Sequence, residues 1–199
     1  DMGDKSKQAI DAIAAALASE QIKRGVQEIS EVLTDCKDRA ESFESQMAEV
    51  FTLLPDATAE AKENMSKDML EFSRDLKVLT DDSVPALYQA ISAGVPEDNV
   101  FDFLTVAQKA AKGGVTELET AVDGLTSVTN AYGVANMSAE KAADIMFTTV
   151  KLGKTDFNQL SSSLYNVVPT AVSAGVSFEN IGAALAAMTA QGVPTAQST

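Results

Sequence analysis

The sequence predicts an all-α protein in which a long coiled-coil helical hairpin is followed by a compact bundle of short helices. Three observations support this fold class. Apolar residues follow a heptad repeat from Ile22 to Leu54, Gly-Val pairs interrupt the second half of the chain, and no segment shows a convincing strand pattern. The chain has 199 residues, of which 45% are hydrophobic, so it is long enough for one or two domains with a core.

The heptad repeat of residues 22–54 alternates steps of four and three, which is the spacing of a coiled-coil seam. Charged residues between the seam positions predict a solvated face. Pro55 ends this helix because its ring disfavours helical geometry at the preceding residue. The predicted seam includes Val26, Ile29, Leu33, Cys36, Phe43, Met47, Val50 and Leu54.

A second heptad run follows Pro55 and predicts an antiparallel hairpin over residues 1–82. Because the second helix is shorter, part of the first needs another partner, which we expect to be a second copy of the chain. The seam cysteine, Cys36, is expected to be a core residue, since no neighbouring base or second cysteine would activate it. A change of phase near residues 18–25 predicts a stutter or kink. The apolar positions of the second run are Met65, Met69, Phe72, Leu76 and Leu79.

Four Gly-Val pairs divide the predicted bundle, residues 83–199, into short helices. A glycine just past a helix end adopts the left-handed conformation, and the apolar residue after it packs back on the last turn. Proline or serine with acidic neighbours follows these pairs, as expected at the start of the next helix. The sequence therefore predicts structural helix stops at Gly94, Gly133, Gly175 and Gly192.

The same signals set the expected helix bounds. Gly113-Gly114 is expected to end one helix, with Thr116 and Glu119 forming the capping box of the next. Gly153 and Thr155 are expected to act in the same way, and Pro169 to kink its helix. The repeated "SAGV" leaves a solenoid open, but the remaining segments match poorly and favour a bundle. The predicted helices are 84–93, 97–112, 117–131, 139–152, 156–174 and 178–191.

The charge balance limits the classes of partner. The chain has 29 acidic and 15 basic residues, with a net charge of -14 and no basic cluster, so we expect no specific nucleic acid partner. Membrane contact is not indicated either. Residues 157–199 contain one charged residue, Glu179, but polar residues and Pro169 interrupt the apolar runs. Buried helices are therefore expected there.

The residue types give no sign of catalysis. The chain lacks histidine and has one cysteine, so it cannot form a common zinc site, and we expect no metal or cofactor. The carboxylate pairs Asp81-Asp82 and Glu97-Asp98 are adjacent in sequence, so on a helix they point apart. The protein is not expected to be an enzyme. Because the chain opens on Asp1 and stops at "PTAQST", we expect it to be a fragment.

Two segments, "ADIMFTTVKLGKTDFNQL" at 143–160 and "PTAVSAGVSFENIGAALAAMTAQG" at 169–192, carry a family resemblance. From about Ala86 onwards the chain resembles the core region of bacteriophage tail tape-measure proteins. The resemblance implies that residues 83–199 are this core region, truncated at its C-terminus. It also implies a much longer helical chain that fills the tail tube and governs tail length. The family motif carries no catalytic residues.

The resemblance thus implies a structural protein of phages or prophages. Its expected partners are further copies of itself, the tail tube and tail assembly proteins. Its expected location is the virion tail, and the bacterial host cytoplasm during assembly. Two alternatives remain open at this point: a coiled-coil adaptor or peptide-binding module with no virion role, and a hydrolase that uses Asp or Glu.

Overall fold

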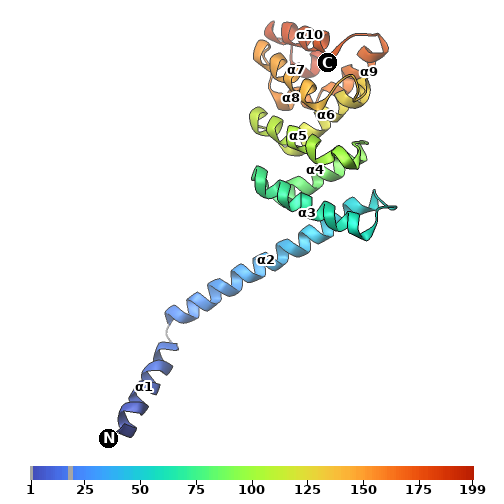
Figure 1. The fold of residues 1–199 in the computed structure, drawn as a ribbon. Helices are drawn as coiled ribbons and strands as arrows, with labels where there is room; N and C mark the ends of the chain where they lie inside the picture. Colours follow the sequence, from blue (N-terminus) through green and yellow to red (C-terminus); the bar gives the residue numbers. More distant parts are fainter. Residues whose placement is uncertain (1, 18–19) are drawn as a thin grey trace. The chain divides into compact units, whose positions relative to one another are not determined.

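The computed structural model describes residues 2–17 and 20–199, and in these ranges it contains helices and no strand (Figure 1). The prediction of an all-α fold is confirmed. The chain divides into two compact units, Asp1–Ser45 and Gln46–Thr199. The first unit contains α1, Met2–Leu17, and most of α2, Glu20–Thr52. The predicted kink near residues 18–25 lies partly outside the described residues.

The second unit begins with the last turns of α2, where Met47 and Val50 are buried, and Leu54 is buried just after the helix ends at Thr52. The next helix, α3, spans Ala59–Leu76 and is capped by Thr58, whose Oγ1 accepts from the Ala61 amide at 3.1 Å. This helix contacts α4, Thr80–Ser92, and α5, Val100–Gly114. The hairpin of α2 with α3 and the domain boundary after residue 82 stay predictions.

The second heptad run stops earlier than the sequence predicts. Met65, Met69 and Phe72 are buried, but α3 ends at Leu76 and Leu79 is 60% exposed. Lys77 ends the helix in a left-handed conformation, with φ 52°. Leu79 therefore lies at the start of α4, outside the apolar face of α3.

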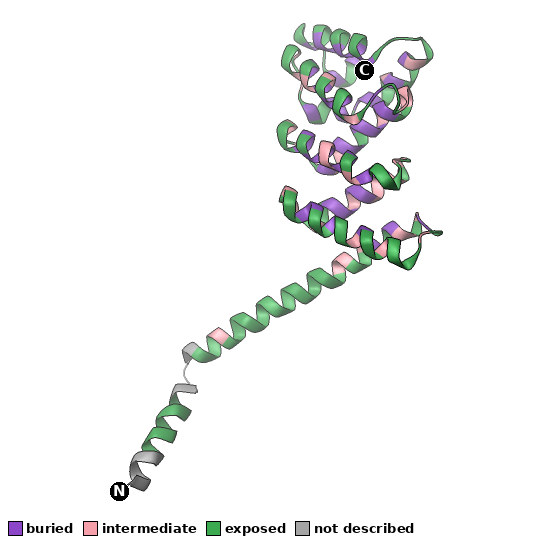
Figure 2. Cartoon of the chain, in the orientation of Figure 1, coloured by how far each residue is buried: buried purple, intermediate pink, exposed green. Residues whose placement is uncertain are grey.

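Helix α6, Leu118–Tyr132, is the centre of the second unit. It contacts α4, α5, α7 (Ala139–Leu152), α8 (Phe157–Ser161) and α9 (Leu164–Ser173). Gly124 lets α8 approach closely, since a Cβ there would lie 2.7 Å from the Ser161 Cβ. The buried residues line the inner faces of these helices (Figure 2). The arrangement is that of a compact bundle.

The remaining elements are η1, Glu97–Asn99, α10, Phe178–Ala190, and α11, Thr195–Ser198. The predicted helix 139–152 matches α7. The predicted helix 156–174 is wrong, because the chain breaks at Ser162 and Ser163 and forms α8 and α9. Asp156 rather than Thr155 caps α8, with its Oδ1 accepting from the Gln159 amide at 2.8 Å. Pro169 lies inside α9, after the break.

The helix end predicted at Gly113-Gly114 is correct in place, since α5 ends at Gly114, but neither glycine turns left-handed. Both glycines lie inside α5, and the residue that turns left-handed is Val115, with φ 52°. Glycine is needed at 114 because a Cβ there would lie 2.5 Å from the Phe157 Cβ. The predicted capping box is absent, since Glu117 is the N-cap residue of α6 and makes no side-chain cap bond. The two glycines thus serve helix packing.

Three of the predicted stops share one geometry. After α4, the Gly94 amide donates to the Ile91 carbonyl at 2.9 Å and the Val95 amide to the Ala90 carbonyl at 3.0 Å. Gly175 and Gly192 make the same pair of bonds after α9 and α10. This is the Schellman pattern, in which glycine adopts positive φ. Gly133, with φ 81° and ψ 134°, ends α6 without that pair of bonds.

Candidate assembly surface

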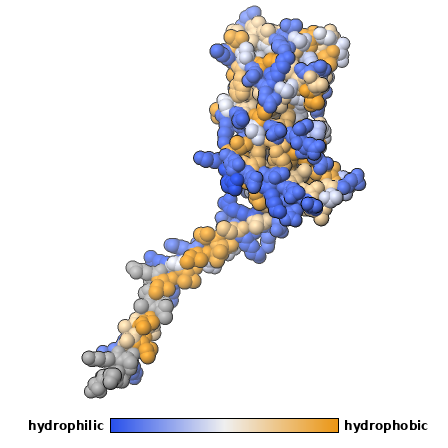
Figure 3. All heavy atoms as spheres, in the orientation of Figure 1, coloured by the Kyte–Doolittle hydropathy of each residue, from blue (hydrophilic) through white to orange (hydrophobic). Residues whose placement is uncertain are grey.

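A row of aliphatic side chains is exposed along α2. Val26 and Ile29 are each 62% exposed and Leu33 is 64% exposed. Val32, 62% exposed, and the exposed thiol of Cys36 belong to the same part of the helix. We call Val26, Ile29, Val32, Leu33 and Cys36 the α2 stripe. In Figure 3 apolar spheres follow this part of the helix, which is exposed throughout in Figure 2.

Charged and polar side chains pair along the same helix. Arg39 Nε lies 2.9 Å from Asp35 Oδ2, Lys37 Nζ lies 3.3 Å from Glu41 Oε1, and Gln27 donates to a carboxylate one turn ahead. Such pairs at a spacing of four residues each stabilise a solvated helix by about 0.3–0.5 kcal/mol. The polar side of α2 is therefore suited to water, and its apolar stripe to burial against another surface.

The predicted seam is divided between exposed and buried parts. Phe43 is half-buried, and Met47, Val50 and Leu54 belong to the core of the second unit. Cys36 is exposed, so it is not a core residue within the single chain. Sequence reasoning missed Val32, which lies outside the four-three spacing. Its position beside Leu33 was the signal that the apolar face is wider than a simple seam.

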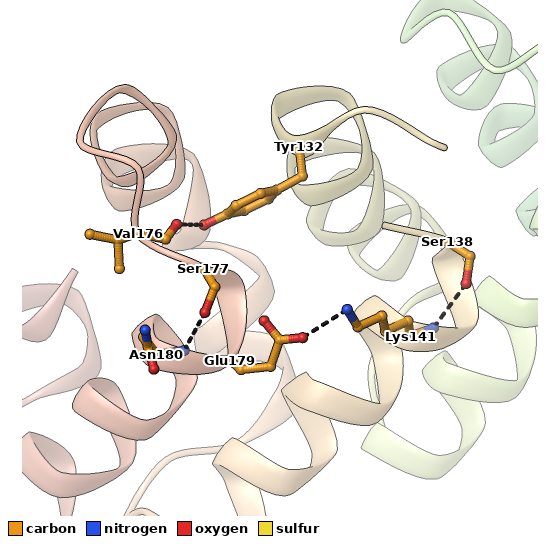
Figure 4. Close-up of polar contacts among 7 residues, drawn as sticks. All are labelled: Tyr132, Ser138, Lys141, Val176, Ser177, Glu179 and Asn180. Atoms are coloured by element: carbon orange, nitrogen blue, oxygen red, sulfur yellow. Dashed lines mark hydrogen bonds and ion pairs between the residues drawn. The ribbon is translucent and has the colours of Figure 1, made fainter. Parts of the chain in front are cut away.

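The predicted stops lie at helix ends of the second unit, where polar contacts hold two of these corners (Figure 4). The hydroxyl of Tyr132, next to Gly133, donates to the Val176 carbonyl at 2.8 Å. Lys141 Nζ of α7 lies 2.8 Å from Glu179 Oε1 of α10. The hydrogen bond from Lys141 lowers the pKa of the Glu179 carboxyl, and burial raises the pKa of the Tyr132 hydroxyl.

Serine side chains cap the helices that leave these two corners. Ser138 Oγ accepts from the Lys141 amide at 3.2 Å, and Ser177 Oγ accepts from the Asn180 amide at 3.3 Å. Each bond satisfies one amide that a helix start leaves without a backbone partner. The polar contacts of Figure 4 are thus accounted for by helix capping, by packing of α7 against α10 and by the bond from the end of α6 to the corner after α9.

The carboxylate pairs singled out in the sequence stand at helix starts. Asp81 and Asp82 lie in the first turn of α4, and Glu97 and Asp98 begin η1. Within residues 2–17 and 20–199, no three Asp, Glu or Cys residues are grouped as a metal site would require. No helix in these ranges combines the length and the apolar character of a membrane span.

Comparison with known proteins identifies the family of this chain. A family model described as phage-related minor tail protein matches residues 66–199. Over 145 residues the chain is 33% identical to a probable tape measure protein of Clostridium phage phiCD119. The chain belongs to the phage tail tape-measure family. This confirms the resemblance seen in the sequence.

The match to the phiCD119 protein covers 71% of the present chain and 15% of the phiCD119 protein. The chain therefore corresponds to a small part of that protein's length. No solved structure matches the chain. The family match begins within α3, so α1 and the α2 stripe lie outside the residues matched by the family model. The residues matched by the family model all lie in the second unit.

Proposed function

We propose that this chain is a structural, non-enzymatic part of a phage tail that associates with further copies of itself through the α2 stripe. We also propose that its long helix contributes to tail length. Its further partners are the tail tube and tail assembly proteins. It acts in the virion tail, after assembly in the bacterial host cytoplasm. The observation that carries the proposal is the exposure of the α2 stripe.

The size of the stripe fits reversible association. Full burial of a Val, Leu or Ile side chain contributes about 1.5–3 kcal/mol. Four such residues on each of two helices, already partly covered, therefore contribute roughly 10 kcal/mol. Association costs about 4–15 kcal/mol in lost translational and rotational freedom. Because this cost is similar in size to the gain, binding through the stripe should depend on protein concentration.

The length of α2 suits a spacer. An α-helix rises about 1.5 Å per residue, so its 33 residues span about 50 Å. A continuous helix converts each added or deleted residue into a fixed change of length. The bundle of the second unit folds back on itself at Gly94, Gly133 and Gly175, so its length does not change in proportion to its sequence.

The test of self-association is sedimentation of the chain with two charges placed in the stripe. Val26→Asp with Leu33→Asp should shift the protein to smaller species, because two carboxylates would be buried on association. The matched control is Gln27→Asp with Thr34→Asp, which adds the same charges at the same spacing one residue along. Met47 is unsuitable for this test because it is 2% exposed and belongs to the core.

The control variant should sediment like the wild-type chain. A wild-type chain that stays monomeric at high concentration, or two variants that behave alike, would contradict self-association through the stripe.

A further inference from the structure

The two ends of α7 differ in shape and charge. Near its first residues lies an open groove of about 270 Å³, and its last residue is an exposed leucine between lysines. An α-helix of 14 residues separates these features by about 20 Å. Both belong to the second unit, so their relation is fixed by the fold of the bundle.

The groove lies where the corner after α4 meets the corner after α6. Val95, Pro96, Phe103 and Val134 give it an apolar lining, and Val134 is 66% exposed. The exposed carboxylates of Asp102 and Glu140 also line it. No basic residue is among its lining residues. We call this hollow the α7 groove.

The groove has fixed walls. Asn130 of α6 donates from Nδ2 to the Ala93 carbonyl at 2.7 Å, which ties the end of α6 to the corner at Gly94. Ser138 caps α7 through its bond to the Lys141 amide. A partner that binds there therefore meets a surface that needs little rearrangement, which lowers the entropic cost of binding.

At the other end of α7, Leu152 is 64% exposed and lies between the exposed residues Lys151 and Lys154. We call these three residues the α7 knob. The backbone after Leu152 is held firmly, since a Cβ on Gly153 would lie 2.5 Å from Thr189 Oγ1 and the Lys154 amide donates to that oxygen at 3.2 Å. The nearby Asp156 carboxylate is occupied in capping α8. The leucine and its lysines are thus presented on a fixed turn.

We propose that the α7 knob of one copy binds in the α7 groove of a second copy. Leu152 fits the apolar lining, and Lys151 and Lys154 face Asp102 and Glu140. The dipole of α7 favours Glu140 in its first turn and Lys151 in its last turn, which accounts for one charge on each of the two surfaces. The contact joins unlike surfaces, so a pair of copies still has one free groove and one free knob, and further copies can add to form an open chain or, where the rotation closes, a ring.

This contact is separate from the α2 stripe, and the test separates the two. All variants are made in the chain that carries Val26→Asp and Leu33→Asp. In that background the sedimentation coefficient should still rise with protein concentration. Lys151→Glu with Lys154→Glu, or Asp102→Lys with Glu140→Lys, should each weaken association at least about tenfold, because like charges then meet.

Mixing the two charge-reversed proteins in equal amounts should restore association, since each groove then meets a knob of opposite charge. Leu152→Ser should weaken it without altering charge. The control is Lys62→Glu with Lys67→Glu, which reverses two lysines of α3 and should leave association unchanged. Circular dichroism checks that every variant keeps its helical content.

Three results would overturn the proposal. The first is a background chain that stays monomeric at every concentration. The second is association that survives both charge reversals. The third is a mixture of the two charge-reversed proteins that remains as dissociated as either alone.

Discussion

At the scale of single residues, Val115 holds a conformation that β-branched residues rarely adopt. Its φ is 52° and its side chain is 89% exposed, so little packing offsets the conformational cost. The Thr116 hydroxyl beside it is buried without a hydrogen-bond partner among the described residues. Gly175 has a similar positive φ, 72°, with no atom within 4 Å of where a Cβ would lie.

Substitutions at these two positions should change the free energy of unfolding in opposite directions. Val115→Gly should raise the free energy of unfolding by about 1 kcal/mol, because it relieves the left-handed conformation. Gly175→Ala should lower it by about 1 kcal/mol, for the same reason reversed. Urea unfolding of both variants measures the effect. Two shifts of the same sign would contradict the conformational explanation.

The ion pair of Lys141 with Glu179 predicts a dependence of stability on pH. The hydrogen bond from Lys141 lowers the pKa of Glu179 in the folded chain. A lowered carboxyl pKa adds stability above the unfolded-state pKa, and this is lost as pH falls through the folded-state pKa. Both side chains are about half exposed, at 50% and 48%, so the contribution is at most about 1 kcal/mol.

Glu179→Gln should therefore lower the free energy of unfolding at neutral pH and have little effect at an acidic pH below the folded-state pKa of Glu179. Lys141→Gln removes the positive charge and should flatten the same part of the pH profile. Urea unfolding across this range measures both. An equal loss at both pH values would point to lost packing instead of lost charge.

At the scale of helices, close approach between elements depends on glycines whose role no local rule reveals. At Gly124 of α6, a Cβ would lie 2.7 Å from the Ser161 Cβ and 2.9 Å from the Ser161 Cα. At Gly113 of α5, the nearest atom would be the tip of the Phe147 ring at 3.1 Å. A ring tip can move more easily than a backbone atom.

Gly124→Ala should thus lower the free energy of unfolding by about 1–3 kcal/mol, as overpacking does. Gly113→Ala is the control and should cost less, because the Phe147 ring can shift. Thermal unfolding of the two variants ranks them. Equal melting temperatures would show that α6 and α8 can separate at little cost.

Local sequence signals predicted the helices whose ends have local causes. The bounds of 139–152 were correct because Ser138 caps the helix and Lys151 lies in its last turn. The prediction failed for the capping box after Gly114 and for the unbroken helix over Ser162 and Ser163, where tertiary contacts decide. Gly114 is needed by Phe157, and Ser161 lies against Gly124. These partners are far apart in sequence, and no periodic pattern records them.

At the scale of the whole molecule, the chain combines an exposed helix with a packed unit. The heptad spacing predicted the positions of the α2 stripe, since spacing alone sets which side chains share a helix face. The spacing could not show that Leu33 is exposed and Met47 is buried, because the burial of Met47 depends on the fold of the second unit. The α7 groove likewise depends on two corners that meet in space.

The contrast between the two units predicts different effects of two deletions. Removing two heptads, residues 29–42, keeps the seam in register and leaves the buried end of α2 intact. Removing α7, Ala139–Leu152, deletes a helix that packs on α5, α6 and α10. Each deletion removes 14 residues, so the second is a control for length.

The most direct measurement is tail length in electron micrographs of phage carrying each deletion in the parent protein. If α2 is extended in the tail, the heptad deletion should shorten the tail by about 20 Å, at about 1.5 Å per residue. The deletion of α7 should abolish tail assembly by exposing core surface. Tails of unchanged length after the heptad deletion, or normal tails after loss of α7, would contradict the account.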